Sequence, residues 1–270
     1  MTDLALDGVS YRYGPSGALA LEAVDLRIAA GERVALVGQN GSGKTTLVRH
    51  LNGLLRPSSG RVLHDGADVA ARTVAQLARS VGLVFQDPDR QIFAGSVRAE
   101  VEFGPRNIGL GGGALHSAVQ AALLEVGLEA DARTNPYDLG ASRRKLLALA
   151  SVQAMGTPVL VLDEPTTGQD LRGIGIVQQL VDGAHAAGRS VIAISHDMDF
   201  VAKSFDRVVV LRAGRVILDG PPKSVFAEAA WEELRSTYLE PPLAAVIGSR
   251  MGIGSTPTDE ALLAALRPAG

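Results

Sequence analysis

The chain has 270 residues, 46% of them hydrophobic and 20% charged, which gives enough apolar surface for one large domain or two small ones. Its 26 lysines and arginines against 29 aspartates and glutamates give a net charge of -3, so nucleic-acid binding by bulk electrostatics has no support. The absence of cysteine excludes disulfides, thiolate metal sites and a cysteine nucleophile.

Strand-like and helix-like segments alternate along the chain, and this order predicts an α/β fold with a largely parallel sheet. A short apolar run at 34–37 precedes a glycine-rich loop, and Leu47, Leu51 and Leu54 follow at helical spacing. The later apolar runs are continuous, which is typical of strands covered on both faces. The further predicted strands are residues 61–63, 81–85, 159–162, 191–194 and 208–211.

Residues 88–156 lack a convincing strand and are predicted to form a helical insertion between two strands of the sheet. Positions 115, 119, 122 and 126 share one helical face, and Gly127 is expected to end that helix. Beyond residue 220, prolines separate short helical pieces, so 221–270 is predicted to be a C-terminal extension of a domain formed by 1–220. Its last helix is expected to open with Thr256 as N-cap and Pro257 in the first helical position.

Two longer stretches without charge, residues 108–124 and 146–162, have to be tested as membrane spans. The first contains several glycines, and the second is interrupted by Gln153, Gly156 and Pro158. Residues 1–4 carry no positive segment, and no long apolar segment follows them. We therefore expect no transmembrane segment and no signal peptide, and a chain on the cytosolic side of the membrane.

The segment from Gly38 to Thr45 fits the pattern G-x-x-x-x-G-K-[ST] between a predicted strand and a predicted helix. Its glycines allow main-chain N–H groups to converge on phosphates, and the helix N-terminus adds partial positive charge. Lys44 is expected to bridge the β and γ phosphates, and the Thr45 hydroxyl to bind Mg²⁺. The predicted phosphate-binding residues are Gly38, Gln39, Asn40, Gly41, Ser42, Gly43, Lys44, Thr45 and Thr46.

Two carboxylates follow the apolar run 159–162, at the strand end where ligands bind in open α/β sheets. Asp163 is expected to hold Mg²⁺ through water, and Glu164 to act as the general base toward the attacking water. Taken alone, the pair could be a solvated helix start before Pro165. Together with the phosphate-binding loop, it predicts a nucleoside triphosphatase.

The order and spacing of these motifs resemble the nucleotide-binding subunits of ATP-binding cassette (ABC) transporters over essentially the whole chain. Gln86 matches that family's Q-loop, Asp170 its D-loop aspartate and His196 its switch histidine. Tyr13 lies where the family places an aromatic ring on adenine, although Tyr11 competes for this role. The resemblance implies ATP as substrate with Mg²⁺. It assigns catalysis to Glu164, His196 and Gln86, and metal binding to Thr45, Gln86 and Asp163.

The resemblance also implies a fold: a P-loop (RecA-like) core sheet, an N-terminal antiparallel β subdomain, a helical insertion and a short C-terminal helical extension. Two ATP molecules would lie between this chain and a second ATPase subunit, either a copy of itself or a paralogue. Membrane-embedded transporter subunits would be further partners, with no nucleic acid partner, and the chain would be peripheral on the cytoplasmic face.

The family's signature loop, Leu-Ser-Gly-Gly-Gln, is altered here. The aligned residues are Leu139, Gly140, Ala141, Ser142 and Arg143. In the family this loop donates hydrogen bonds to the γ-phosphate held by the opposite subunit, and the added Cβ atoms should weaken that contact. Arg143, Arg144 and Lys145 fall in the first turn of the predicted helix, where cations are disfavoured. Either an anion from a partner docks there, or these side chains point to solvent or pair with Asp138.

Within the family, residues 85–93, 101–107 and the pair Pro241-Pro242 resemble the ATPases of energy-coupling factor (ECF) importers. This resemblance implies uptake of a small solute, a vitamin or a transition-metal ion. The alternative is a nucleotide-binding structural subunit whose degenerate signature loop is compensated by a more active partner ATPase. An ABC-type ATPase of DNA repair fits poorly, because no long heptad segment is present.

Overall fold

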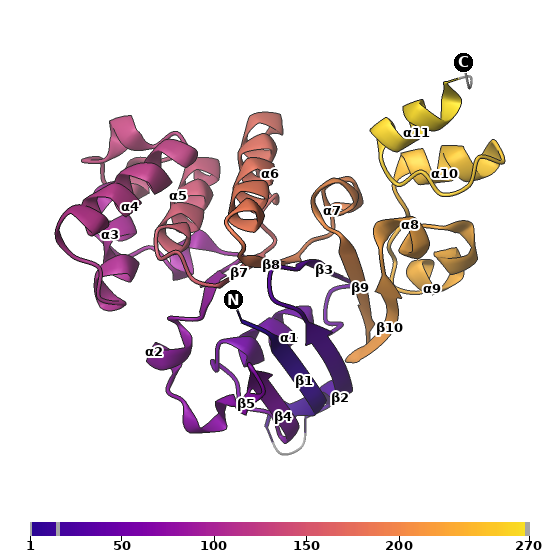
Figure 1. The fold of residues 1–270 in the computed structure, drawn as a ribbon, viewed down its shortest axis with the longest axis horizontal. Helices are drawn as coiled ribbons and strands as arrows, with labels where there is room; N and C mark the ends of the chain where they lie inside the picture. The colour runs from indigo at the N-terminus through magenta and orange to yellow at the C-terminus, as the bar shows by residue number, and fades with distance from the viewer. Residues whose placement is uncertain (1, 15–16, 268–270) are drawn as a thin grey trace.

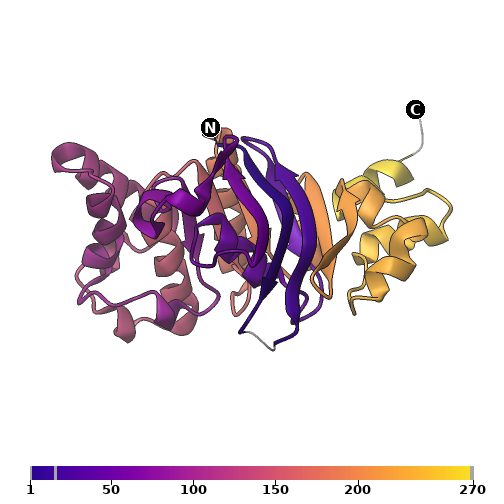
Figure 2. The same cartoon turned by 90° about the horizontal axis from the view of Figure 1, so that it is seen from below.

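The computed structural model describes residues 2–14 and 17–267. A six-stranded sheet lies at the centre of the molecule, and a four-stranded antiparallel sheet lies below it (Figure 1). A helical insertion lies on one side of these sheets and the C-terminal helices lie on the opposite side, as the view from below also shows (Figure 2). This is the α/β fold with an N-terminal antiparallel subdomain that the sequence predicts.

The six-stranded sheet has the order β10-β9-β3-β8-β7-β6, and only the β9–β10 pair is antiparallel. Its neighbouring side chains alternate between two cores: Val34 and Leu36 face one, whereas Ala35 and Val37 face the other. The continuous apolar runs are therefore strands covered on both faces. The strands are β3 (Arg33–Val37), β6 (Val81–Val84), β7 (Val159–Asp163), β8 (Ser190–Ile194), β9 (Arg207–Arg212) and β10 (Arg215–Gly220).

The antiparallel sheet has the order β2-β1-β4-β5 and shares one hydrophobic core with β3, β7 and the helix α1. Its strands are β1 (Leu4–Arg12), β2 (Leu19–Ile28), β4 (Ser59–His64) and β5 (Ala67–Asp68). The pairing of β1 with β2 is interrupted by register shifts, and Gly8 and Ala23 have positive φ angles there. These irregularities break the alternation of apolar and polar residues in the middle of β1 and the first half of β2, whereas Val24, Leu26 and Ile28 alternate with exposed charged residues.

The segment between β6 and β7 contains helices and 3₁₀ turns, with no strand in this described part of the chain. Helix α4 buries Val119 and Ala122, and Gly127 follows its end with φ 67°. Helix α5 packs against α3, α4 and the sheet. The helices up to β7 are α1 (Lys44–Leu51), α2 (Val74–Leu77), α3 (Val97–Asn107), α4 (Gly112–Glu125) and α5 (Ala141–Gln153), with 3₁₀ turns at Val69–Ala71, Pro88–Arg90, Glu129–Asp131 and Pro136–Asp138.

The C-terminal extension is continuous with the main hydrophobic core. Phe226 and Leu234 are 0% exposed and belong to the same cluster as one face of the parallel sheet. The predicted extension includes residues 268–270, and the predicted domain begins at residue 1. These four residues lie outside the described part of the chain. The helices after β7 are α6 (Leu171–Ala186), α7 (Met198–Ser204), α8 (Pro222–Val225), α9 (Trp231–Arg235), α10 (Leu243–Arg250) and α11 (Asp259–Leu266), with a 3₁₀ turn at Glu228–Ala230.

The predicted start of the last helix is wrong by two residues. The N-cap of α11 is Thr258, whose side chain accepts a hydrogen bond from the main-chain N–H of Ala261. Thr256 is buried, and its hydroxyl donates to the carbonyl of Ala244 at 2.7 Å. Because this tertiary contact takes the Thr256 side chain, Pro257 precedes the helix.

A search of the helices in 2–14 and 17–267 finds none that is both long enough and apolar enough to cross a membrane.

Candidate functional site

The loop between β3 and α1 has the backbone that phosphate binding requires. Gly38, Gly41 and Gly43 all lie in the positive-φ region, at 143°, 80° and 107°, where side chains are disfavoured. Lys44, the first residue of α1, folds back over this loop, and its Nζ donates to the carbonyls of Gly38 and Gln39. The loop thus forms a nest of main-chain groups at a helix N-terminus, with one lysine charge above it.

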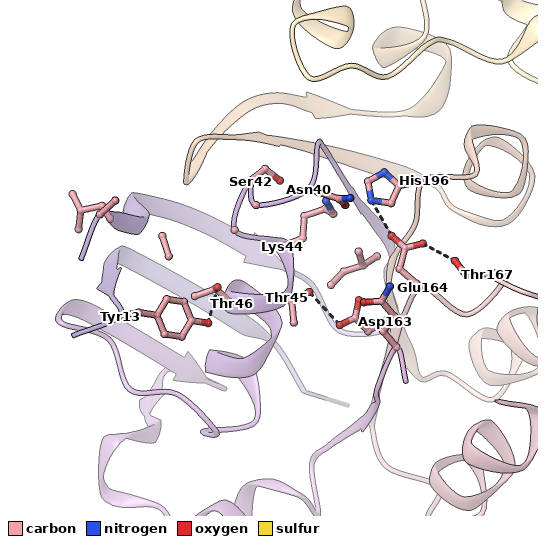
Figure 3. A pocket seen from close by; sticks show the side chains of 17 residues that line it. Tyr13, Asn40, Ser42, Lys44, Thr45, Thr46, Asp163, Glu164, Thr167 and His196 are labelled. Atoms are coloured by element: carbon pink, nitrogen blue, oxygen red, sulfur yellow. Dashed lines mark hydrogen bonds and ion pairs between the residues drawn. The ribbon is translucent and has the colours of Figure 1, made fainter. Parts of the chain in front are cut away.

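A cleft of about 590 Å³ opens beside this loop (Figure 3). Tyr13 lies toward one end of the residues in Figure 3, and Glu164 and His196 lie toward the other. The predicted residues Asn40, Gly41, Ser42, Gly43, Lys44, Thr45, Thr46, Gln86, Asp163, Glu164, Tyr13 and His196 all line the cleft, whereas Gly38 and Gln39 contribute carbonyls beneath Lys44. The topology therefore brings residues from five separate segments into one site.

Two carboxylates stand at the carboxyl end of β7. The Thr45 hydroxyl donates to Asp163 Oδ2 at 3.2 Å, while Asp163 Oδ1 is buried with no hydrogen-bond partner in the described chain. Burial raises the pKa of Asp163, an effect that the Thr45 hydrogen bond opposes. An oxygen left without a partner at the edge of a phosphate-binding loop is suited to a cation or its bound water.

Glu164 is held by two hydrogen bonds, and its Oε1 atom is buried without a hydrogen-bond partner in the described chain. Its main-chain N–H donates to the carbonyl of Ile194 at 3.0 Å, and Thr167 Oγ1 donates to its Oε2 at 3.3 Å. The Nε2 atom of His196 lies 3.1 Å from its Oε1. The residue has a φ of 51°, which a residue with a side chain adopts only when its surroundings fix it. Its carboxylate therefore has a defined direction into the cleft.

Burial also sets the protonation behaviour at this end of the cleft. It raises the pKa of Glu164, although the charge of Lys44 opposes the shift. Burial and the same lysine charge lower the pKa of His196, so this imidazole is neutral at neutral pH. A carboxylate with a raised pKa beside a neutral histidine is a pair that can take a proton from water and hold it.

Tyr13 and Tyr11 occupy different positions. Tyr13 lines the cleft and is 51% exposed, and its hydroxyl shares a hydrogen bond of 3.0 Å with Thr46 Oγ1. The ring of Tyr11 lies behind it, edge-on to Tyr13 and to the buried His50, with centroids 4.9 Å apart in both pairs. Only Tyr13 of the two presents its ring to the space beside the phosphate-binding loop.

Comparison with known proteins agrees with this geometry. Residues 21–167 match the family model described as ABC transporter. The chain belongs to this family. The energy-coupling factor transporter ATP-binding protein EcfA2 of Symbiobacterium thermophilum is 40% identical over 254 residues, covering 92% of this chain and 88% of that protein.

Two further matches extend the comparison. The solved structure of CbiO1 from Clostridium perfringens, part of the ABC transporter complex CbiONQ, is 36% identical. It has a TM-score of 0.75 and covers 93% of this chain and 98% of its own. A relative from Methanosarcina acetivorans is 42% identical over 240 residues, and the match covers 89% of this chain but only 39% of that longer protein. The ABC ATPase fold thus extends over nearly the whole described chain.

Residues 139–143, predicted to be an altered signature loop, lie at the N-terminus of α5 and do not line the cleft. Gly140 is the N-cap, and Leu139 is buried below it. Ser142 and Gln169 exchange two hydrogen bonds: Ser142 Oγ donates to Gln169 Oε1 at 2.8 Å, and Gln169 Nε2 donates to the Ser142 carbonyl at 3.0 Å. Asp170, beside Gln169, caps α6 by accepting from the N–H of Gly173.

The basic residues after this loop have partners within the chain. Arg143 pairs with Asp131, and Arg144 with Asp89 at 3.0 Å. Lys145 is buried, and its Nζ donates to the carbonyl of Thr167 at 3.2 Å. Of the alternatives left open by the sequence, pairing within the chain is observed, but with other carboxylates than Asp138, because the turns at Glu129–Asp131 and Pro88–Arg90 bring Asp131 and Asp89 to this helix.

Sequence reasoning did not select Thr167 or Gln169 as site residues, and it considered Lys145 only as a possible contact for a partner's anion. A threonine three positions after Glu164 is the signal that could have found Thr167, because a single turn brings its hydroxyl back to that carboxylate. The contacts of Lys145 and Gln169 join segments more than twenty residues apart, and no local sequence pattern predicts such contacts.

Proposed function

We propose that this ABC ATPase hydrolyses ATP to power uptake of a small solute, a vitamin or a transition-metal ion, through membrane-embedded subunits of an ECF-type importer. The observation that carries the hydrolytic part is the placement of Glu164 beside the phosphate-binding loop, between His196 and Thr167. The similarity to EcfA2 and to CbiO1 supports the transport part.

Nucleotide binding uses the chain's main-chain groups first. The N–H groups of residues 38–45 and the N-terminus of α1 receive the β and γ phosphates. Lys44 exchanges its carbonyl partners for phosphate oxygens, whose negative charge compensates the burial that lowers its pKa. Tyr13 supplies the apolar face against which the adenine ring stacks.

A magnesium ion fits the donor set at the edge of the loop. The Thr45 hydroxyl and the Asp163 carboxylate already lie together, and the buried Asp163 Oδ1 has a free lone pair. Gln86 lines the same cleft and can add an amide oxygen. When bound, Mg²⁺ neutralises charge on the β and γ oxygens.

Hydrolysis then depends on Glu164 and His196. The Glu164 carboxylate accepts the proton of the attacking water, because burial has raised its pKa toward the range in which a carboxylate is an effective base. Neutral His196 lies 3.1 Å from the same carboxylate, where it is placed to contact the γ-phosphate. Residues 139–143 serve the nucleotide of a second ATPase subunit, a copy or a paralogue.

A second cavity of about 550 Å³ supports a membrane partner. It lies between α2, α3 and α5 and is mostly apolar, with Phe93 59% exposed and Phe103 48% exposed at its edge. The two rings meet edge to face with centroids 4.6 Å apart. The buried carboxylate of Glu100 fixes the wall by accepting from the N–H groups of Phe93 and Ala94. An exposed aromatic cavity of this kind fits a short apolar segment of a membrane subunit.

The Glu164→Gln variant tests the hydrolytic role, because glutamine keeps the side-chain size and can still accept from Thr167. We expect unchanged ATP affinity and a turnover at least about 10²-fold lower, the contribution of a lost general base. Equilibrium nucleotide titration and steady-state phosphate release measure the two quantities. Undiminished turnover would remove Glu164 from its role. A wild-type chain that binds ATP but hydrolyses it only when a second, different ATPase is present would favour the structural-subunit alternative.

A further inference from the structure

The turn that follows Glu164 is held by the helix that carries the altered signature loop. Lys145, in the second turn of α5, donates from Nζ to the main-chain carbonyl of Thr167 at 3.2 Å. Thr167 donates from Oγ1 to Glu164 Oε2 at 3.3 Å. Two hydrogen bonds in series therefore connect α5 with the carboxylate that activates water.

Packing alone does not account for a lysine at this position. Lys145 is only 5% exposed, and burial of an ammonium group costs several kcal/mol unless charges and hydrogen bonds compensate it. The compensating charges are those of Glu164, Asp163 and Asp87, which oppose the effect of burial on the pKa of Lys145. A methionine would fill the same space without the desolvation cost, so the charge and the hydrogen bond are the distinguishing features of this residue.

Glu164 needs such support. Its φ of 51° is a strained conformation for a residue with a side chain, and strain of this kind persists only where the surroundings fix it. One end of its turn is fixed by the N–H bond from Glu164 to Ile194. The other end, at Thr167, is exposed to solvent and is anchored by Lys145.

We propose that Lys145 is a positioning residue for Glu164, acting through Thr167. The inference rests on the proposed role of Glu164 as general base. Ser142 and Gln169 exchange two more hydrogen bonds between the same helix and the same loop. When the signature loop docks on a partner's nucleotide, its displacement is therefore transmitted to Glu164, the general base of the same chain.

The test uses the assembled transporter ATPase and the variants Lys145→Met, Lys145→Arg and Lys223→Met. Lys223 is exposed on α8, outside the cleft, and supplies a matched lysine-to-methionine control. We expect Lys145→Met to lower kcat about 10- to 100-fold, the effect of misplacing a catalytic group by about 1 Å. KM and nucleotide affinity should stay within about twofold, because the phosphate-binding loop is intact. Lys145→Arg should recover most of the activity, and Lys223→Met should match the wild type.

A Lys145→Met enzyme with wild-type kcat would overturn the inference, as would a loss that appears only in KM or an arginine variant as slow as the methionine one. If Lys145→Met does not fold, Thr167→Val and Thr167→Ser test the second bond of the series, from the Thr167 hydroxyl to Glu164, without which Lys145 cannot act through Thr167. The valine variant should lose activity and the serine variant should keep it, and equal rates for the two would overturn the inference. The proposed function stands, whatever the Lys145 and Thr167 variants show, if the wild-type enzyme hydrolyses ATP and Glu164→Gln does not. An inactive wild-type enzyme would overturn both the proposed function and this inference.

Discussion

Alanine substitution of the first glycine in the phosphate-binding loop should be far more damaging than the same change three residues later. At Gly38, a Cβ atom would lie 2.1 Å from the carbonyl oxygen of Leu211 and 2.9 Å from Ser42 Oγ, and φ is 143°. At Gly41, φ is 80° but no atom lies within 4 Å of the added carbon. Gly41→Ala is therefore a matched control that carries backbone strain without a clash.

The free energy of unfolding separates the two contributions. Strain at a disfavoured φ costs about 1–3 kcal/mol, and an overpacked contact with rigid backbone adds about 1–3 kcal/mol. Gly38→Ala should thus lose roughly 2–6 kcal/mol, and Gly41→Ala, which carries the strain alone, about 1–3 kcal/mol. At about 2–4 °C per kcal/mol for a chain of this size, calorimetry without nucleotide should resolve the difference. If Gly38→Ala unfolds at the same temperature as Gly41→Ala or as the wild type, this description of the loop is refuted.

Two further predictions concern pH and the C-terminal extension. Because burial raises the pKa of Glu164 and only its ionised form accepts a proton, kcat should fall as pH decreases through a pKa above the usual glutamate range. An acid limb of the kcat–pH profile at or below that range would contradict the assignment. Phe226→Ala should destabilise the main unfolding transition by about 3–5 kcal/mol, since its side chain is 0% exposed in the core shared with the sheet. As a control, Leu263→Ala, at a position 59% exposed, should change the free energy of this transition by less than about 0.5 kcal/mol. If denaturant unfolding shows the main transition unchanged in Phe226→Ala, the extension unfolds independently of the sheet.

The sequence pattern predicts the parts of the fold that local chemistry determines. The glycines at 38, 41 and 43 occupy the positive-φ positions of the loop, and the apolar runs form strands buried on both faces. Asp163 and Glu164 emerge at the strand end where the topology of a parallel sheet requires them. These features depend on spacing within short segments, which a single chain displays directly.

The features that the sequence does not predict depend on contacts between distant segments. The carboxylates that pair with Arg143 and Arg144 come from separate 3₁₀ turns, so the sequence could offer only the nearby Asp138 as a possible partner. Thr256 and Thr258 are both good N-caps, and only the bond from Thr256 to Ala244 decides between them.

A crystal structure with a non-hydrolysable ATP analogue and Mg²⁺ tests the central claim most directly. The β and γ phosphates should lie against the N–H groups of residues 38–45, with Lys44 turned from its carbonyl partners onto them. The metal should lie beside Thr45 and Asp163, and Glu164 should face the terminal phosphate. An analogue bound elsewhere, with this loop and both carboxylates unchanged, would contradict the assignment of the cleft as the site of ATP hydrolysis.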